Sequence, residues 1–288
     1  MQQTYRAELA VIAAAGGLLL SAFVALSFAQ APAQATAQGK GGAGKGKARP
    51  SRPTPHWPDG RVNLGPLPGE KGVWSGGAGM TLATNVGRGV DNALVNLPTN
   101  MKIPDVPFLP WARALYDYRQ KQLTADDPHV RCKASGGPRL YQTPYGFEFI
   151  EIPEMQQIFA IGVGGPHTWR VFYMDGRQHP KDLDPGYYGH SIGHWEGDTL
   201  VVDTVGFNQR FWITREGLPH TEQLHMIEKF TRTEYDRLLY EVTIDDPGAY
   251  SRPWSGGWSI GWNANGEPYE YICQDNNRDM KHMVGSGE

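Results

Sequence analysis

Apolar and polar residues alternate with a period of two in several short segments of the second half of the chain. Such alternation is typical of β-strands that bury one face. It predicts strands at residues 147–152, 157–162, 168–174, 187–195, 199–205, 223–233, 238–244 and 269–273. Short turns separate these segments, and none of the intervening stretches has the pattern of a crossover helix. We therefore expect an antiparallel meander.

The spacing of apolar residues ahead of these strands predicts one helix, at residues 111–124. Pro110 fits its first turn, and Asp126-Asp127-Pro128 ends it. Residues 59–107 are rich in Gly, Pro and Asn, which predicts irregular structure with one or two short strands.

A meander of this length exposes two strand edges unless the sheet closes or is covered. We therefore predict a mainly β fold, a barrel or half-barrel with lipocalin-like strand order and one flanking helix. A β-sandwich is the alternative. Residues 59–288 have the length of one β-rich domain.

The N-terminal segment differs in composition from the rest of the chain. An apolar run follows Arg6 and ends at Ser27-Phe28-Ala29, which predicts a signal peptide at residues 1–29. An uncleaved membrane anchor is the alternative, because about 20 apolar residues can span a bilayer. Residues 30–58 are rich in Gly, Lys and Pro and predict a disordered basic linker.

Charge divides the chain in the same way. The linker has five basic residues and no acidic ones, and residues 1–29 are neutral. The whole chain has a net charge of −3, so residues 59–288 carry −8. A basic tether on an acidic domain does not fit a nucleic-acid-binding protein. A solvated spacer is expected, with weak contact to an anionic envelope surface as the alternative; the oligomeric state stays open.

The chain has two cysteines, Cys132 and Cys273. In an exported protein an even number favours a disulfide, and two free buried thiols are the alternative. Export would place the domain in the periplasm or outside the cell.

A serine-hydrolase pattern, G-x-S-x-G, occurs at residues 189–193, and the order Ser191, Asp203, His220 resembles a catalytic triad. A nucleophile elbow requires a helix after the serine. Here Glu196-Gly197 predicts a hairpin turn into the next strand. We do not expect Ser191 to be a nucleophile.

The histidine spacings do not predict a metal site. His190 and His194 have the spacing of a zinc pair on a helix, but on a strand they lie about 13 Å apart. In His220-x-Glu222-x-x-His225, residues 222 and 225 would face opposite sides of a strand. Asp175, His179, Asp182 and Asp184 fall in a Pro-containing loop and are expected to be solvated. Motifs for nucleotide or redox cofactors are absent, and no cofactor is predicted.

One acidic residue, Asp203, interrupts an apolar run in a predicted strand. In a barrel, alternate positions of neighbouring strands point inward, so we expect Asp203 to face the interior with His225 and Glu228. These three are candidate catalytic acid–base residues. Arg170, or Arg232, is the expected partner, and a structural ion pair is the alternative.

Aromatic residues provide a second set of candidates. Trp254, Trp258 and Trp262 are spaced four apart with glycines between them. Such rings fit the mouth of a cavity, where they would stack on sugar or aryl groups. With Arg170 they are the candidate ligand-binding residues. Packing against the Gly-rich backbone is the alternative.

An ordered set of short segments resembles a family of exported bacterial proteins of unknown function. The segments are Pro110-Trp111-Ala112, Asp127-Pro128 with Cys132, residues 167–170, 175–182, 195–208, 220–230, 244–247, Pro253-Trp254 and 273–279. The resemblance covers most of residues 108–279 and implies export and a β-rich domain, without assigning catalytic residues. The chain departs from that pattern in its longer Gly/Lys tether and in Gly256-Gly257 after Trp254. The second difference leaves the neighbouring strand without a clear prediction.

Three hypotheses follow. The leading one is an exported barrel that binds a small, partly apolar or aromatic molecule in its interior. The alternatives are a secreted enzyme that uses a His–carboxylate pair and a structural envelope protein without a ligand.

Overall fold

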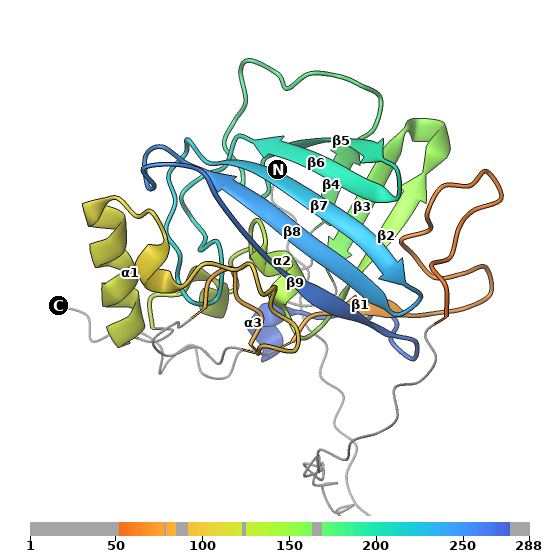
Figure 1. The fold of residues 1–288 in the computed structure, drawn as a ribbon, viewed down its shortest axis with the longest axis horizontal. Coiled ribbons are helices and arrows are strands. Elements are labelled where there is room, and N and C mark those ends of the chain that lie inside the picture. The colour runs from red at the N-terminus through yellow and green to blue at the C-terminus, as the bar shows by residue number, and fades with distance from the viewer. Residues whose placement is uncertain (1–51, 78, 85–91, 123–124, 163–168, 277–288) are drawn as a thin grey trace, which may run out of the picture. The chain divides into compact units, whose positions relative to one another are not determined.

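The computed structural model describes residues 52–77, 79–84, 92–122, 125–162 and 169–276. The predicted signal peptide and residues 30–51 of the predicted linker lie outside the described residues. In the described part of the chain, nine strands follow one another in sequence order and close into a barrel (Figure 1). The prediction of a mainly β barrel is confirmed.

The barrel closes where the first strand meets the last. The strands are β1 Val73–Ser75, β2 Phe147–Ile152, β3 Gln157–Gly162, β4 Trp169–Tyr173, β5 His190–Glu196, β6 Thr199–Val205, β7 His225–Glu234, β8 Arg237–Asp245 and β9 Trp254–Asn263. Trp74 of β1 pairs with Phe147 of β2 on one side and with Trp262 of β9 on the other. Because β1 pairs with both β2 and β9, the closed sheet has no free edge for a further strand. The strand predicted at residues 269–273 is wrong.

One pair of neighbouring strands is parallel, although the nine strands follow one another in sequence order. A short turn was expected to lead from the strand at residues 168–174 into an antiparallel neighbour. Instead β4 and β5 run in parallel and pair at Phe172–Ser191 and Tyr173–Ile192. Parallel neighbours require a long connection, and residues 174–189 provide it. The eight other strand pairs of the barrel are antiparallel.

Short helices accompany the barrel: α1 Pro110–Gln122, α2 Arg139–Gln142 and α3 Cys273–Asn276, with 3₁₀ turns at Ile103–Asp105, Pro128–Arg131 and Pro153–Met155. The predicted flanking helix is α1, which buries Ala112 and Tyr116. Helix α2 sends the ring of Tyr141 into the barrel core. Among the described residues, no helix has the length and apolarity needed to cross a membrane.

Aromatic side chains fill the barrel. The ring of Tyr141 lies 4.8–5.1 Å from those of Phe147, Phe230 and Tyr240, measured between ring centroids. Tyr240 in turn lies 5.0 Å from Trp258. Ring pairs at these separations are favourable beyond their burial. The core is therefore built on packed rings.

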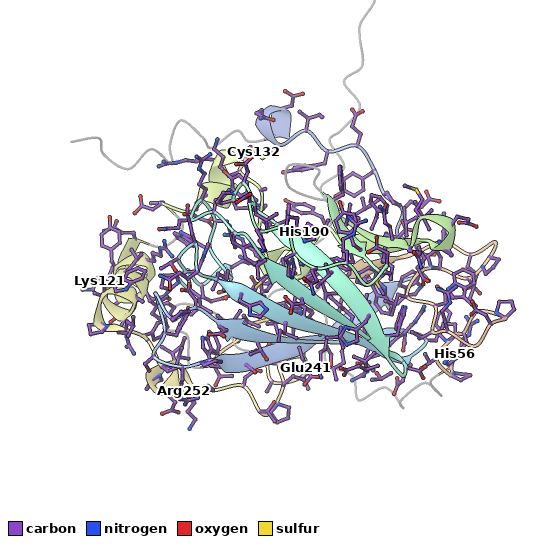
Figure 2. The ribbon with its side chains drawn as sticks, turned by 90° about the horizontal axis from the view of Figure 1, so that it is seen from above. His56, Lys121, Cys132, His190, Glu241 and Arg252 are labelled. Carbon is purple, nitrogen blue, oxygen red and sulfur yellow. A yellow bond between two sulfur atoms is a disulfide. The ribbon has the colours of Figure 1, made fainter. Side chains whose placement is uncertain are left out.

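The disulfide prediction is confirmed. Cys132 and Cys273 are bonded across 141 residues of sequence, with their Cα atoms 5.6 Å apart. Cys132, labelled in Figure 2, follows a 3₁₀ turn, and Cys273 is the first residue of α3. The bond attaches the C-terminal segment to the chain that precedes α2.

Residues 52–58, which were expected to belong to the linker, make contacts with the barrel. The Thr54 hydroxyl donates to the carbonyl of Arg232 at 3.0 Å. The indole N–H of Trp57 donates to the carboxylate of Glu151 at 3.2 Å. The part of the chain that contacts the barrel thus begins before the predicted domain boundary, with residues 52–58.

Candidate functional sites

The predicted catalytic residues lie on two sides of the barrel wall. On β6, Leu200, Val202 and Thr204 are fully buried, whereas the side chain of Asp203 is 36% exposed. The prediction that Asp203 faces the interior is wrong. Since Val201, beside it on the outer face, is also buried, this strand is apolar on both faces, and its pattern does not reveal which one is inside.

Glu228 faces inward and pairs with Arg170 of β4. The guanidinium donates to both carboxylate oxygens, at 3.0 Å from Nη1 and 2.6 Å from Nη2. The two side chains are 1% and 0% exposed. Burial alone would lower the pKa of Arg170, but the Glu228 carboxylate outweighs it and the pKa is raised.

Hydroxyl groups complete this buried network. Nη1 of Arg170 also donates to the Tyr141 hydroxyl at 2.8 Å, and Nη2 donates to Ser191 and Thr204, each at 3.1 Å. The Tyr240 hydroxyl donates to Glu228 at 2.9 Å. A buried charge pair needs such partners to offset its desolvation. The geometry fits the structural alternative, and Ser191 lies in the core with its hydroxyl bonded to Arg170.

Asp203 forms a different cluster, on the outer face. Its Oδ1 accepts from Nε2 of His225 at 2.9 Å and from Nε2 of His179 at 3.1 Å. His225 was predicted as a partner from β7. His179 was expected to be a solvated loop residue, but the crossover of residues 174–189 carries it onto the barrel wall.

A third imidazole extends the cluster. Nδ1 of His179 lies 2.8 Å from Nδ1 of His190, the first residue of β5, which is labelled in Figure 2. The His190 ring stacks on Tyr173, with centroids 5.1 Å apart and planes 21° from parallel. Partial burial, His179 and Arg177 lower the pKa of His190. Within the described ranges, no group of three or more His, Cys, Asp or Glu side chains is arranged to hold a metal ion.

The three tryptophans predicted at a cavity mouth face the interior instead. Trp254 and Trp258 are buried, and Trp262 lies 4.9 Å from Trp74 in an edge-on contact. They share the inner face of β9 with Gly256 and Ile260, while Gly257 lies on the outer face, where another segment crosses closely. A Cβ on Gly257, for example, would lie 2.2 Å from a backbone oxygen of β8 and 2.9 Å from Leu97. The four-residue spacing therefore reflects packing.

An open cleft of about 350 Å³, here called the β3–β5 cleft, lies beside the start of β3 and the end of β5. It is lined by Arg61, Glu151, Pro153, Gln156, Gln157, Ile158, Met174, His194 and Trp195. A second hollow of about 300 Å³ adjoins it and shares Arg61, Glu151 and Pro153. None of the site residues predicted from the sequence lines either hollow. The signal that could have indicated the β3–β5 cleft is Trp195, at the end of a predicted strand.

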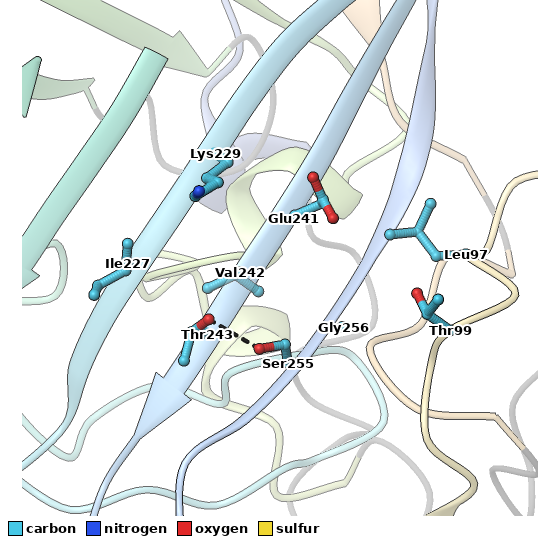
Figure 3. A pocket seen from close by; sticks show the side chains of 9 residues that line it. All are labelled: Leu97, Thr99, Ile227, Lys229, Glu241, Val242, Thr243, Ser255 and Gly256. Atoms are coloured by element: carbon cyan, nitrogen blue, oxygen red, sulfur yellow. Dashed lines mark hydrogen bonds between the residues drawn. The ribbon is translucent and has the colours of Figure 1, made fainter. Parts of the chain in front are cut away.

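Figure 3 shows a third hollow, of about 280 Å³, on the outer face of β7, β8 and β9. Lys229 and Glu241 are direct cross-strand neighbours there, and Thr243 and Ser255 share a hydrogen bond of 2.9 Å. Lys229 forms an ion pair with Glu196 at 3.5 Å, and no aromatic side chain lines this hollow, so it is a weaker ligand site than the β3–β5 cleft.

Comparison of the chain with protein-family models, with curated proteins and with solved structures gives no match. Functional assignment therefore depends on the chain's own residues and their geometry.

Proposed function

We propose that this protein is an exported barrel that binds a small, flat, partly apolar molecule in the β3–β5 cleft. The observation that carries the proposal is an open cleft of about 350 Å³ at a break in the hydrogen bonding of the barrel wall. Volumes of this size are typical of small-molecule sites. We therefore propose a ligand site in the wall, and not in the interior, which aromatic side chains fill.

The cleft follows from the short pairing of β4 with β5. β4 ends at Tyr173, and its pairing with β5 reaches Ile192, so the later residues of β5 have no partner on β4. Met174 occupies part of the gap, with its backbone N–H bonded to Gln156 at 2.8 Å. A Cβ on Gly193 would lie 2.6 Å from the sulfur of Met174.

Apolar side chains form much of the lining. Trp195 packs partly against the core, while Ile158 is an inward residue of β3. Met174 adds a flexible thioether, which adapts well to ligands of different shape. An indole beside such groups suits a flat apolar or aromatic ligand.

Charge in the cleft selects against anions. The guanidinium of Arg61 donates to Asp59 at 2.8 Å and to Glu151 at 3.1 Å. Two carboxylates thus surround one cation, which leaves a local charge of about −1 and favours neutral or cationic ligands over carboxylates. The partly exposed Arg61 and His194 can bond a hydroxyl group on the ligand.

Export remains part of the proposal. Its support is the confirmed disulfide, a bond that is typical of exported proteins, together with the apolar run ahead of Ala29. Mass spectrometry of the protein from a secreting host tests this point: a mature N-terminus after Ala29 is expected.

The binding test is calorimetry with three aryl probes of different charge: phenyl glucoside, benzylammonium and phenylacetate. We expect the neutral and cationic probes to bind and phenylacetate to bind more weakly. Trp195→Ala is expected to raise the Kd at least about tenfold, since lost stacking and burial exceed about 1.4 kcal/mol. Trp169→Ala is the matched control, because Trp169 is 60% exposed on the outside of β4.

Two outcomes contradict the proposal. One is the absence of binding by all three probes at millimolar concentration, which favours the structural envelope protein. The other is an unchanged Kd in Trp195→Ala, or an equal loss in Trp169→Ala, which places any binding elsewhere.

A further inference from the structure

The outer cluster of Asp203, His179 and His190 forms a line of hydrogen bonds that ends on Nε2 of His190, which bonds to none of the described residues. The carboxylate oxygen can only accept, so Nε2 of His179 carries a proton and donates it. When His179 is neutral, its Nδ1 has no proton and must accept. His190 then donates from Nδ1, and its Nε2 is left with an available lone pair.

The ring geometry supports a proton between the two imidazoles. The Nδ1 atoms lie 2.8 Å apart, while the ring centroids are 5.0 Å apart. The rings therefore meet nearly end to end, as in a hydrogen bond. A proton taken up at Nε2 of His190 can be balanced by transfer of the shared proton to His179, whose cation the Asp203 carboxylate stabilises.

Neighbouring groups hold this line in place. His225, from β7, donates to the same oxygen of Asp203 and limits rotation of the carboxylate. Tyr173 stacks on His190, and the Arg177 guanidinium lies 3.9 Å from the Tyr173 centroid. Asp175 binds Arg177 through both carboxylate oxygens. A base that is unprotonated near neutral pH fits the lowered pKa of His190.

We propose that Nε2 of His190 is the general base of a hydrolytic site for activated carboxylic esters, with His179 and Asp203 as positioning residues. Nε2 removes a proton from water as the water oxygen bonds to the ester carbonyl carbon. The tetrahedral intermediate then breaks its bond to the leaving oxygen, and the proton on His190 passes to that oxygen. The products are a carboxylic acid and an alcohol or phenol.

The openness of the site determines the substrate class. The three relay side chains lie on the outer wall and are partly exposed, so the site does not enclose its substrate. An open site makes few contacts with its substrate, so the ester must already have a good leaving group. This favours aryl esters as substrates. Ser191, the neighbouring hydroxyl, faces the core, so water is the nucleophile that remains.

This site is separate from the β3–β5 cleft. His190 and His194 are four residues apart on β5, about 13 Å along a strand, and it is His194 that borders the cleft. Loss of probe binding in Trp195→Ala with unchanged ester hydrolysis would confirm that separation, and failure of either proposal leaves the other open to its own test.

The experiment measures hydrolysis of 4-nitrophenyl acetate by the full mature protein. His190→Gln is expected to lower kcat/KM at least about 100-fold, the usual contribution of a general base. His56→Gln is the matched control: it removes another partly exposed imidazole that lies beside an aspartate, Asp198 at 3.4 Å, and we expect less than a twofold change. Circular dichroism checks that both variants fold.

A pH profile separates positioning from structure. Asp203→Asn removes the charge that stabilises the cationic pair, so the midpoint of the rising limb should move to lower pH while the plateau rate falls. A merely structural role would lower the rate without moving the midpoint. The proposal is overturned if His190→Gln keeps the wild-type rate, or if wild type is no faster than free imidazole at the same molar concentration.

Discussion

Removal of the Glu228 carboxylate is the sharpest test of how the barrel core is held together. In Glu228→Ala, Arg170 keeps its charge in a position where it is 1% exposed, and it loses two hydrogen bonds of 3.0 and 2.6 Å. The Tyr240 hydroxyl loses its acceptor as well. Breaking a buried pair in this way costs about 3–5 kcal/mol. For a domain of this size, that lowers Tm by roughly 6–20 °C.

The assay is urea denaturation of wild type and variants at pH 7 with the disulfide intact. The double variant Arg170→Met with Glu228→Leu removes both charges, so its loss should be smaller than the sum of the single losses by about 2–3 kcal/mol. Glu228→Gln keeps the size of the side chain and provides a milder variant if Glu228→Ala does not fold.

An exposed pair supplies the control. Arg177 and Asp175 have the same two-oxygen geometry, but their side chains are 43% and 26% exposed. Asp175→Ala should therefore cost less than about 1 kcal/mol. The reasoning is refuted if Glu228→Ala costs no more than Asp175→Ala, or if the single losses at Arg170 and Glu228 simply add.

Three further predictions concern the scaffold. Replacing Cys132 and Cys273 together by Ser should cost about 5 kcal/mol in the chain-entropy model, for a separation of 141 residues; equal urea midpoints with and without the bond would contradict this. Gly257→Ala places a Cβ 2.2 Å from a backbone oxygen of β8 and should lower stability by about 1–3 kcal/mol, whereas Gly261→Ala, with open space around it, should be neutral in the same thermal melts. Burial lowers the pKa of His129 from 6.5 to about 4. Between these two pH values the unfolded chain binds more protons than the folded one, so stability falls as the pH drops from 6.5 to 4. His129→Gln should therefore reduce the dependence of the urea midpoint on pH, and an unchanged dependence would contradict the prediction.

The strands that the sequence predicts best are short apolar runs bounded by turn-forming or polar residues. The bounds of β2, β3 and β6 agree with prediction to the residue. β9 is different: no strand was predicted there, because Gly256-Gly257 interrupt the run, although Trp254, Trp258 and Trp262 do mark its inner face. The three residues of β1 are too few to carry a pattern, so a barrel could be predicted but its closure could not.

The candidate sites depend on contacts that sequence spacing does not reveal. Asp203 and His225 were expected together because neighbouring strands carry them, and they do bond. Their side of the wall could not be inferred, since β6 is apolar on both faces. His179 reaches them from the loop after β4. Sequence spacing does not indicate this contact, because it depends on the path that the loop takes over the barrel wall.

The parallel pairing of β4 with β5 is a matter of parity. In a closed ring of strands that follow one another in order, an even number can alternate up and down throughout. An odd number cannot, and somewhere two neighbours must point the same way. With nine strands, this chain meets that requirement between Tyr173 and His190.

Parity thus accounts for both candidate sites. Because β4 and β5 point the same way, the chain must run back along the barrel after β4 before it can begin β5. This connection carries His179 to Asp203. It also shortens the bonded contact between β4 and β5, which leaves the gap beside Met174. A tenth strand, inserted in the crossover to restore full alternation, would be expected to close the cleft and displace His179 together.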